Sequence, residues 1–207
     1  AHIVREEMNR AGAVELAMPV VLVTHDLDDA VMLSDRMLLI SEGRALQTGS
    51  PLTLLRHPAG VEAARLLGLR NVFDGEVIAH EPAAGRSILG WQSRRLSIPL
   101  CVEHAVGARV QWYVPVDEVR PFSPDRASEE EPLDNSVEGL VLGEQRLSDR
   151  RRFEISVSGA SVYFEMSHAE ASRAGLAVGQ GLNVHLHGRA VHLMPSTPVS
   201  GNGQWSG

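Results

Sequence analysis

Lysine is missing from this chain of 207 residues, whose nineteen basic residues are all arginine. A P-loop of the pattern GxxxxGK[ST] needs its lysine to reach the β- and γ-phosphates of a nucleotide. The chain by itself is therefore not a complete P-loop ATPase. Basic residues are also outnumbered, 19 against 26 acidic residues, which gives a net charge of −7. Because binding to a nucleic-acid backbone needs a basic field, this balance argues against nucleic acid as a partner.

Cysteine occurs once, at Cys101, which excludes an internal disulfide. No signal peptide precedes the first helix-like segment, and we therefore expect a reducing, cytoplasmic location. Cys101 follows Pro99-Leu100 in a predicted strand, and we expect it to be a small buried hydrophobe rather than a nucleophile. Apolar runs of the roughly 18 residues that a membrane span needs are absent. Aromatic residues make up only 4% of the chain, but its apolar content of 43% is ordinary for one large or two small globular domains.

The first 68 residues show an α/β pattern. Residues 1–11 have apolar positions at helical spacing. The run Val20–Val23 is apolar and mostly β-branched, which predicts a buried parallel strand. A helix from Leu27, with acids in its first turn, is predicted next. Ligands of open α/β sheets bind beyond the carboxyl ends of the strands, so His25 is a candidate for chemistry, although it could merely end the strand.

Local turn chemistry predicts the elements that follow. Residues 37–49, MLLISEGRALQTG, are typical of two strands around the turn Ser41-Glu42-Gly43. Ser50-Pro51 is an N-cap followed by proline at the first helical position, and it predicts the first of two short helices, at about 51–57 and 60–67.

Beyond Gly68 the pattern becomes all-β, and it occurs twice. Short β-like runs separated by turn residues begin at Asn71, and alternation of period two is clear around Phe153 and Phe164. Segments 68–77 and 132–141 share Asn, Gly and Val at an offset of 64, and segments 106–119 and 178–191 resemble each other at an offset of 72. Two tandem barrel-like units are the simplest explanation. We predict units at 69–122 and 135–195, an exposed linker at 123–134 and a disordered tail at 196–207.

Residues 21–51 resemble the last part of an ABC-transporter ATP-binding domain. The resemblance rests on four motifs: Thr24-His25-Asp26, Asp28-Asp29-Ala30, Ser34-Asp35-Arg36, and Glu42-Gly43-Arg44 through Gly49. It implies that His25 is the switch histidine, which contacts the γ-phosphate of ATP and assists hydrolysis. The Walker A, signature, Walker B and D-loop motifs of the family are absent from these residues. We therefore expect a C-terminal piece of an ATPase subunit that binds ATP and Mg only in its full-length form and is inactive alone.

The rest of the chain resembles the accessory TOBE, or Mop-like, barrels of importer ATPases, and most of all those of the molybdate importer. The fold class expected is thus an α/β C-terminal piece of an ABC ATPase domain followed by an all-β region of tandem small OB-like barrels. The resemblance implies an oxyanion site for molybdate or tungstate at Arg70, Asn71 and Ser167, with His187 in place of the family's lysine. Asp134-Asn135 in the second copy departs from the pattern and would repel an anion. A barrel region kept only for regulation or dimerisation is an equally good alternative.

Partners and competing functions follow from the same resemblance. It implies membrane permease subunits and a second copy of the ATPase subunit as partners, at the inner face of the cell membrane. The alternatives are a stand-alone oxyanion-binding protein, or an importer ATPase for sulfate, iron, polyamines or sugars. His185 and His187, at i and i+2 of a predicted strand, could bind zinc or nickel with His192, but solvent-facing imidazoles are favoured and no metal is expected. Arg150–Arg152 is interpreted as a solvated turn.

Overall fold

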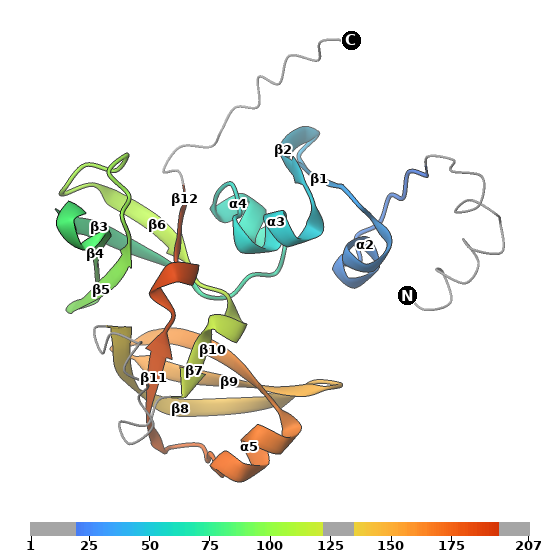
Figure 1. Cartoon of the computed structure of the whole chain (residues 1–207). Helices are drawn as coiled ribbons and strands as arrows, with labels where there is room; N and C mark the ends of the chain where they lie inside the picture. Colours follow the sequence, from blue (N-terminus) through green and yellow to red (C-terminus); the bar gives the residue numbers. More distant parts are fainter. Residues whose placement is uncertain (1–19, 122–134, 195–207) are drawn as a thin grey trace. The chain divides into compact units, whose positions relative to one another are not determined.

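The computed structural model describes residues 20–121 and 135–194 (Figure 1). The predicted helix at 1–11, the linker at 123–134 and the tail at 196–207 lie outside these described residues. The chain divides into two compact units, with a boundary between Leu67 and Gly68. In the described ranges, no helix is both long enough and apolar enough to cross a membrane.

The first unit contains three short helices and a hairpin. Their bounds are α2 (Leu27–Leu33), β1 (Met37–Ser41), β2 (Arg44–Gly49), α3 (Pro51–Arg56) and α4 (Val61–Leu66). Asp26 caps α2 by accepting a hydrogen bond from the Asp29 amide, and Ser50 caps α3, whose first residue is Pro51. The hairpin turns at Glu42 and Gly43, which both have positive φ. The predicted hairpin and the three helices predicted within the described residues of this unit are confirmed.

The buried strand predicted at Val20–Val23 is wrong. This segment is not in a strand, and the side chains of Val21 and Val23 are 90% and 92% exposed. A buried parallel strand needs hydrogen-bonded neighbours and covered faces. In the described part of this unit the only paired strands are β1 and β2, which pair with each other in antiparallel fashion. The expected α/β sheet is therefore not observed.

The second unit is mostly β, as predicted. Its strands are β3 (Val72–Glu81), β4 (Arg86–Trp91), β5 (Arg94–Pro99), β6 (Arg109–Tyr113), β7 (Val119–Pro121), β8 (Ser136–Arg146), β9 (Arg150–Val157), β10 (Ala160–Ser167), β11 (Gly181–Leu186) and β12 (His192–Met194). Its short helices are η1 (Pro82–Ala84), η2 (Val116–Glu118), α5 (His168–Ala174) and η5 (Gly188–Ala190). The ten strands form two five-stranded sheets, in the orders β12-β6-β3-β4-β5 and β10-β9-β8-β11-β7. We call these the first and the second barrel.

The two barrels exchange a strand. β7 comes from the first half of the unit but pairs with β11 of the second barrel. β12 comes from the second half but pairs with β6 of the first barrel. Each barrel is therefore completed by residues from the other half of the sequence, which the predicted boundaries did not anticipate (Figure 1).

The repeat seen in the sequence is a repeat of backbone geometry. The strand register shifts after Val77 in β3 and after Val141 in β8. The carbonyl oxygen of Val77 accepts the Gly107 amide at 2.7 Å, and that of Val141 accepts the Gly179 amide at 2.8 Å. Both glycines have a φ of 85°, which L-residues rarely adopt. A bulge and a tight glycine turn thus recur at offsets of 64 and 72 residues.

Two buried asparagines connect the barrels in equivalent ways. The Asn71 side chain donates to the Tyr163 carbonyl and accepts from the Tyr163 amide, both at 2.7 Å. The Asn135 side chain donates to the Ser97 carbonyl at 2.8 Å and accepts from the Ser97 amide at 2.6 Å. Ser97 and Tyr163 lie on the outer strands β5 and β10, so each amide pairs with backbone groups that a neighbouring strand would otherwise satisfy.

One hydrophobic core runs through both barrels, with different side chains in each. In the first barrel, Phe73, Trp91 and Trp112 pack with ring centroids 4.8–5.4 Å apart. In the second, Phe153 stacks on Phe164 at 5.1 Å, and the predicted alternation is confirmed because both rings are buried. Cys101 is buried as predicted, and burial raises the pKa of its thiol.

Candidate ligand site

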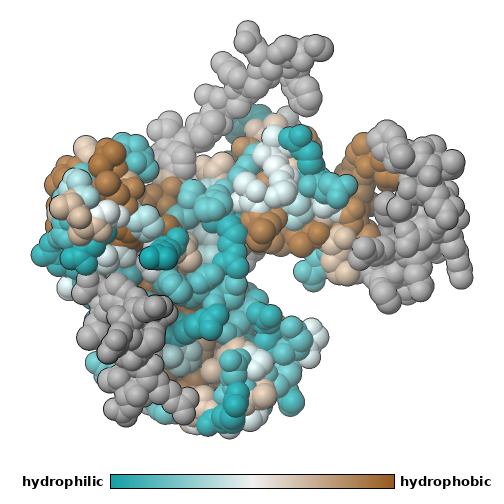
Figure 2. Space-filling model, in the orientation of Figure 1, coloured by the Kyte–Doolittle hydropathy of each residue, from teal (hydrophilic) through white to brown (hydrophobic). Residues whose placement is uncertain are grey.

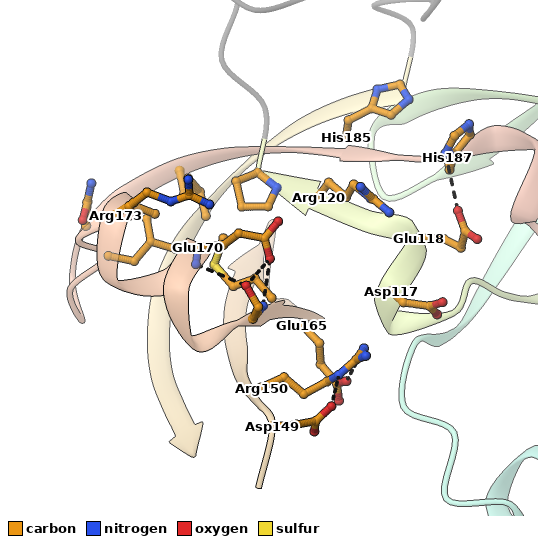
Figure 3. A pocket seen from close by; sticks show the side chains of 17 residues that line it. Asp117, Glu118, Arg120, Asp149, Arg150, Glu165, Glu170, Arg173, His185 and His187 are labelled. Atoms are coloured by element: carbon orange, nitrogen blue, oxygen red, sulfur yellow. Dashed lines mark hydrogen bonds and ion pairs between the residues drawn. The ribbon is translucent and has the colours of Figure 1, made fainter. Parts of the chain in front are cut away.

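The candidate site is a groove of the second barrel, lined by residues from both halves of the unit (Figure 3). Its volume is about 1140 Å³. η2 and β7 contribute residues from the first half, whereas β10, α5 and β11 contribute residues from the second. The lining is rich in charge, with acidic Asp117, Glu118, Asp149, Glu165 and Glu170, basic Arg120, Arg150 and Arg173, and the imidazoles of His185 and His187.

The structure brings together only two of the four predicted oxyanion ligands. Ser167 and His187 line the groove, whereas Arg70 and Asn71 do not. Asn71 holds the backbone of Tyr163, and the Arg70 guanidinium lies 5.1 Å from the centroid of the Tyr163 ring. A cation over an aromatic ring is stabilised by the ring quadrupole. The Arg70-Asn71 pair therefore joins the two barrels in this structure.

Ser167 is the N-cap of α5. Its hydroxyl accepts the Glu170 amide, and the Glu170 carboxylate accepts from the Ser167 amide at 2.9 Å and from its hydroxyl at 2.7 Å. These hydrogen bonds from Ser167 lower the pKa of the exposed Glu170 carboxyl, with smaller contributions from the charges of Arg173 and Arg120. An anion that used the Ser167 donors would have to displace this carboxylate first.

The predicted histidine pair is only partly as expected. β11 ends at Leu186, so His187 is not in the strand, and its Nδ1 lies 3.4 Å from a carboxylate oxygen of Glu118. His185 is buried, with 7% of its surface exposed, and its ring centroid is 6.0 Å from that of His187. The prediction that both imidazoles face solvent is wrong for His185, because the exchanged strand β7 pairs with β11 at this position.

The arginine run also differs from its interpretation as a solvated turn. Arg150, Arg151 and Arg152 begin strand β9. Arg152 contacts the nearly buried carboxylate of Glu165 at 2.7 and 2.8 Å, and Arg150 lies 3.7 Å from the same group. These pairs come from cross-strand neighbours, since Arg152 is directly opposite Glu165 in the sheet.

Two cations of the groove, Arg120 and Arg173, were missed by sequence reasoning. Arg120 lies on β7 and Arg173 in the last turn of α5, and the two are 53 positions apart in the sequence. Every acidic residue of the groove has an interaction partner. Glu118 contacts His187, and Glu170 accepts a hydrogen bond from Ser167. Asp149 and Glu165 form ion pairs with arginines, and Asp117 also takes part in an interaction. Among the ion pairs found within the described ranges, none involves Arg120 or Arg173. The lining nevertheless contains five acidic residues against three arginines, and the charges of Arg120 and Arg173 both act on the Glu170 carboxylate.

His25 lies in the first unit, in the loop before helix α2. It is exposed, and it is flanked by the Thr24 hydroxyl, which accepts the Asp26 amide at 3.0 Å, and by the cap residue Asp26. This geometry fits a side chain that is held at the start of a helix. The chain contains no lysine for a phosphate cradle, so its own residues do not fit a complete site for ATP and Mg.

The similar proteins are import ATP-binding proteins. A spermidine/putrescine import ATP-binding protein of Aggregatibacter actinomycetemcomitans is 41% identical over 64 residues, which cover 31% of this chain and 17% of that protein. A molybdenum import ATP-binding protein of Rhodobacter capsulatus is 27% identical over 187 residues, which cover 88% of this chain and 50% of that protein. A molybdate/tungstate import ATP-binding protein of Pyrococcus abyssi is 24% identical over 86% of this chain and 48% of its own length. The chain thus spans half or less of these relatives.

Among solved structures, the cytoplasmic molybdate-binding protein ModG, in a form with molybdate bound, matches with a TM-score of 0.52 at 19% identity. The match covers 61% of this chain and 97% of that one, and at this identity it shows a shared fold alone. No family model matches the chain. The homologues are ATP-binding subunits of ABC importers, and the structural neighbour has a TOBE-like, OB-like fold.

Proposed function

We propose that this chain is part of the ATP-binding subunit of an importer for molybdate or a related oxyanion, and that its second barrel binds an oxyanion in the groove described above. The observation that carries the proposal is the pair Arg120 and Arg173, two guanidinium groups that come from different halves of the unit and line the same groove. The names of the molybdate and tungstate relatives and of the molybdate-binding neighbour support the choice of ligand.

The chemistry of the groove suits a tetrahedral oxyanion. Guanidinium groups donate several hydrogen bonds in a fixed plane, and such charge-assisted bonds to an anion are short and strong. His187 adds a donor and, once protonated, a charge, although Glu118 competes for it at 3.4 Å. Ser167 contributes only if the Glu170 carboxylate moves away. Arg70 and Asn71, the other two sequence candidates, act here through the junction between the barrels.

Calorimetry on the whole chain tests this proposal. Molybdate, tungstate and sulfate are titrated in turn at pH 6 and pH 8. We expect heat from molybdate or tungstate. Arg173→Gln should weaken binding at least tenfold, whereas Arg95→Gln, an exposed arginine of β5, should leave it unchanged. Absence of heat with all three anions at both pH values would refute oxyanion binding and leave the barrels as a scaffold.

For the first unit, we propose that His25 contacts the γ-phosphate of ATP in a subunit that also contains the phosphate cradle. A contact that strengthens in the transition state acts on the rate of hydrolysis more than on nucleotide affinity. His25→Ala in the longer subunit, assembled with its permease, should therefore lower ATP turnover strongly and ATP affinity little. Normal turnover would rule out this role. The 207-residue chain alone should release phosphate only at background rates.

The regulatory part of the proposal concerns partners. Two ATP-binding subunits would pair about a two-fold axis, with the barrels as further contacts, and would work with membrane permease subunits at the cytoplasmic face. An oxyanion that binds one state of the pair more tightly must shift the equilibrium toward that state. A stand-alone oxyanion-binding protein remains the alternative. The two differ in one measurement, because only the subunit would show ATP turnover that changes with molybdate.

A further inference from the structure

The strand exchange joins two parts of the chain that are each incomplete alone. Residues 68–121, the first half, supply β7 to the second barrel, and residues 135–194, the second half, supply β12 to the first barrel. Without its exchanged strand, the first sheet would end at β6 and the second at β11. An unpaired strand edge is a template for pairing with a strand of another molecule. The missing strand can therefore come from any copy of the chain that presents it.

Buried contacts between the two halves are specific to this protein. Asn71 of the first half binds the backbone of Tyr163 in the second, and Asn135 of the second half binds the backbone of Ser97 in the first. Gly188 of the second half lies against the Ser97 carbonyl, in a space too small for a Cβ. One hydrophobic core contains side chains of both halves. All these contacts would be unchanged if one half came from a second copy.

The strand order determines how the two halves can be connected within one chain. β7 and β8 both pair with β11 in antiparallel fashion, so they run parallel to each other on its two sides. Val184 of β11 pairs with Pro121 at the end of β7 and with Val137 near the start of β8. Neighbouring strands lie about 4.8 Å apart, which places Pro121 and Val137 about 10 Å apart. Because β11 lies between them, a connection within one chain must pass around it.

Residues 122–134, which we call the connecting segment, have to make this crossover. The segment has thirteen residues, and a connection between parallel strands needs about a dozen or more. It is therefore close to the shortest segment that can serve. In a dimer whose chains exchange halves, the segment would join β7 of one pair of barrels to β8 of the other and would not have to pass around β11. Exchange thus removes a constraint and keeps every contact between the halves.

We propose that two copies of this chain form a dimer by exchanging halves, so that the first half of each chain completes both barrels with the second half of the other. Domain swapping of this kind is a low-cost route to a dimer. It competes with closure inside one chain, where a short linker keeps the halves at an effective concentration of about millimolar. Exchange therefore prevails where chains fold at high local concentration, or where the connecting segment is too short. The inference concerns the barrels themselves and does not depend on the ligand of the groove.

Disulfide trapping between two different chains tests the exchange. Gln111 of β6 pairs with Met194 of β12 across the halves, and with Asp74 of β3 within the first half. In a Cys101→Ser background, one chain carries Gln111→Cys and the other Met194→Cys. The two are unfolded in denaturant, refolded together at high concentration and oxidised. We expect a covalent heterodimer, since exchange places β6 of one chain beside β12 of the other.

The matched control combines Gln111→Cys in one chain with Asp74→Cys in the other. These two positions belong to the same half and stay in the same chain with or without exchange. The control should therefore give at least tenfold less heterodimer. Circular dichroism of each cysteine variant establishes that it folds before the chains are mixed.

Shortening the connecting segment is the second test. Deletion of residues 123–133 leaves two residues between Pro121 and Asn135, which can span at most about 11 Å. This length is too short to pass around β11. We expect the shortened chain to sediment at twice the mass of one chain, with the circular dichroism spectrum of the parent. A Gly/Ser segment of twice the natural length should instead give the monomer.

The possible outcomes decide for or against the exchange. A folded monomer of the shortened chain would overturn the proposal, as would equal amounts of heterodimer from the two cysteine pairs. If the shortened chain does not fold, the cysteine pairs decide alone, and a yield from Gln111→Cys with Met194→Cys no higher than the control refutes the exchange.

Discussion

The first barrel packs three aromatic side chains, Phe73, Trp91 and Trp112, whereas the second has a stacked pair, Phe153 and Phe164. Their surfaces differ as well, since on the face shown in Figure 2 hydrophobic residues gather on the first barrel and hydrophilic residues cover most of the second. The backbone hydrogen bonds of bulges, glycine turns and asparagine bridges are nevertheless the same in both. The two barrels therefore share their backbone geometry but differ in the side chains of their cores and surfaces.

The largest expected effect tests whether the barrels are energetically separate. Phe153→Ala removes a fully buried ring from the second barrel and should cost about 3–5 kcal/mol of unfolding free energy. Because each barrel contains a strand of the other, we expect both to unfold in one transition. Trp91 and Trp112 both report on the first barrel. Their fluorescence midpoint in urea should therefore move with the circular dichroism midpoint of the whole β region.

Trp112→Ala, the matched change in the first barrel, is the reciprocal experiment. It should lower the circular dichroism midpoint in a single step, and Trp91 should still report that step. Two separate transitions in either variant would show that the barrels fold independently despite the exchanged strands.

A smaller loss of stability is expected when either bridging asparagine is replaced. Because Asn71 and Asn135 make equivalent hydrogen bonds, we expect the two losses to be equal. Asn71→Ala leaves the amide and carbonyl of Tyr163 without their side-chain partner, and Asn135→Ala does the same to Ser97. Each substitution should cost about 1–3 kcal/mol of unfolding free energy, the range for buried polar groups left unpaired. Chemical denaturation measures both variants.

The same two variants separate a structural role from a ligand role. If Asn71 acts only at the junction, Asn71→Ala and Asn135→Ala should retain the molybdate affinity of the parent chain under conditions where they remain folded. A selective loss of affinity in Asn71→Ala would reinstate it as an oxyanion ligand.

The smallest effect concerns α5, which only the second barrel has. Ser167→Ala removes the helix cap and should cost about 1 kcal/mol, while Ser93→Ala, in an exposed turn of the first barrel, should be neutral. The contribution of Glu170 depends on pH in a defined direction. Because its pKa is lowered in the folded chain, its stabilisation is present above the ordinary glutamate range and is lost as the pH falls through the lowered value.

Denaturation midpoints at pH 7 and pH 3 check this assignment. Replacement of Glu170 by Gln should remove part of the difference in stability between the two pH values. An unchanged pH dependence in Glu170→Gln would show that the capping box does not stabilise the second barrel.

Sequence reasoning succeeded where structure is set by neighbours in the chain. The strand β9 (Arg150–Val157) follows from period-two alternation, and the capped helix α3 follows from Ser50-Pro51; both are local signals. The prediction of a buried strand at Val20–Val23 failed, because the burial of a strand depends on neighbouring strands that this short segment does not specify. The very short strands β7 and β12 were missed because they are defined by pairing with distant strands.

The site was harder to predict than the fold for the same reason. The resemblance named Ser167 and His187 as oxyanion ligands, and both line the groove, but Arg120 and Arg173 come together only through the strand exchange. Asn71 and Asn135 were marked by the repeat, yet the backbone groups that they bind lie 92 and 38 residues away. The sequence did contain one signal for part of the site. The offset between the two repeats changes from 64 to 72 residues, which shows that the second copy contains extra residues, and these include helix α5.

The exchanged strand β12 has a consequence for how the protein is made. Tyr113 of β6 pairs with His192, so the first barrel has an unpaired edge until nearly all of the second has left the ribosome. Contacts between residues so far apart in sequence form late, since closing a long loop costs chain entropy before it gains pairing. During synthesis the edge of β6 would therefore stay unpaired and could bind other edge strands. A holdase chaperone would bind most readily in this interval.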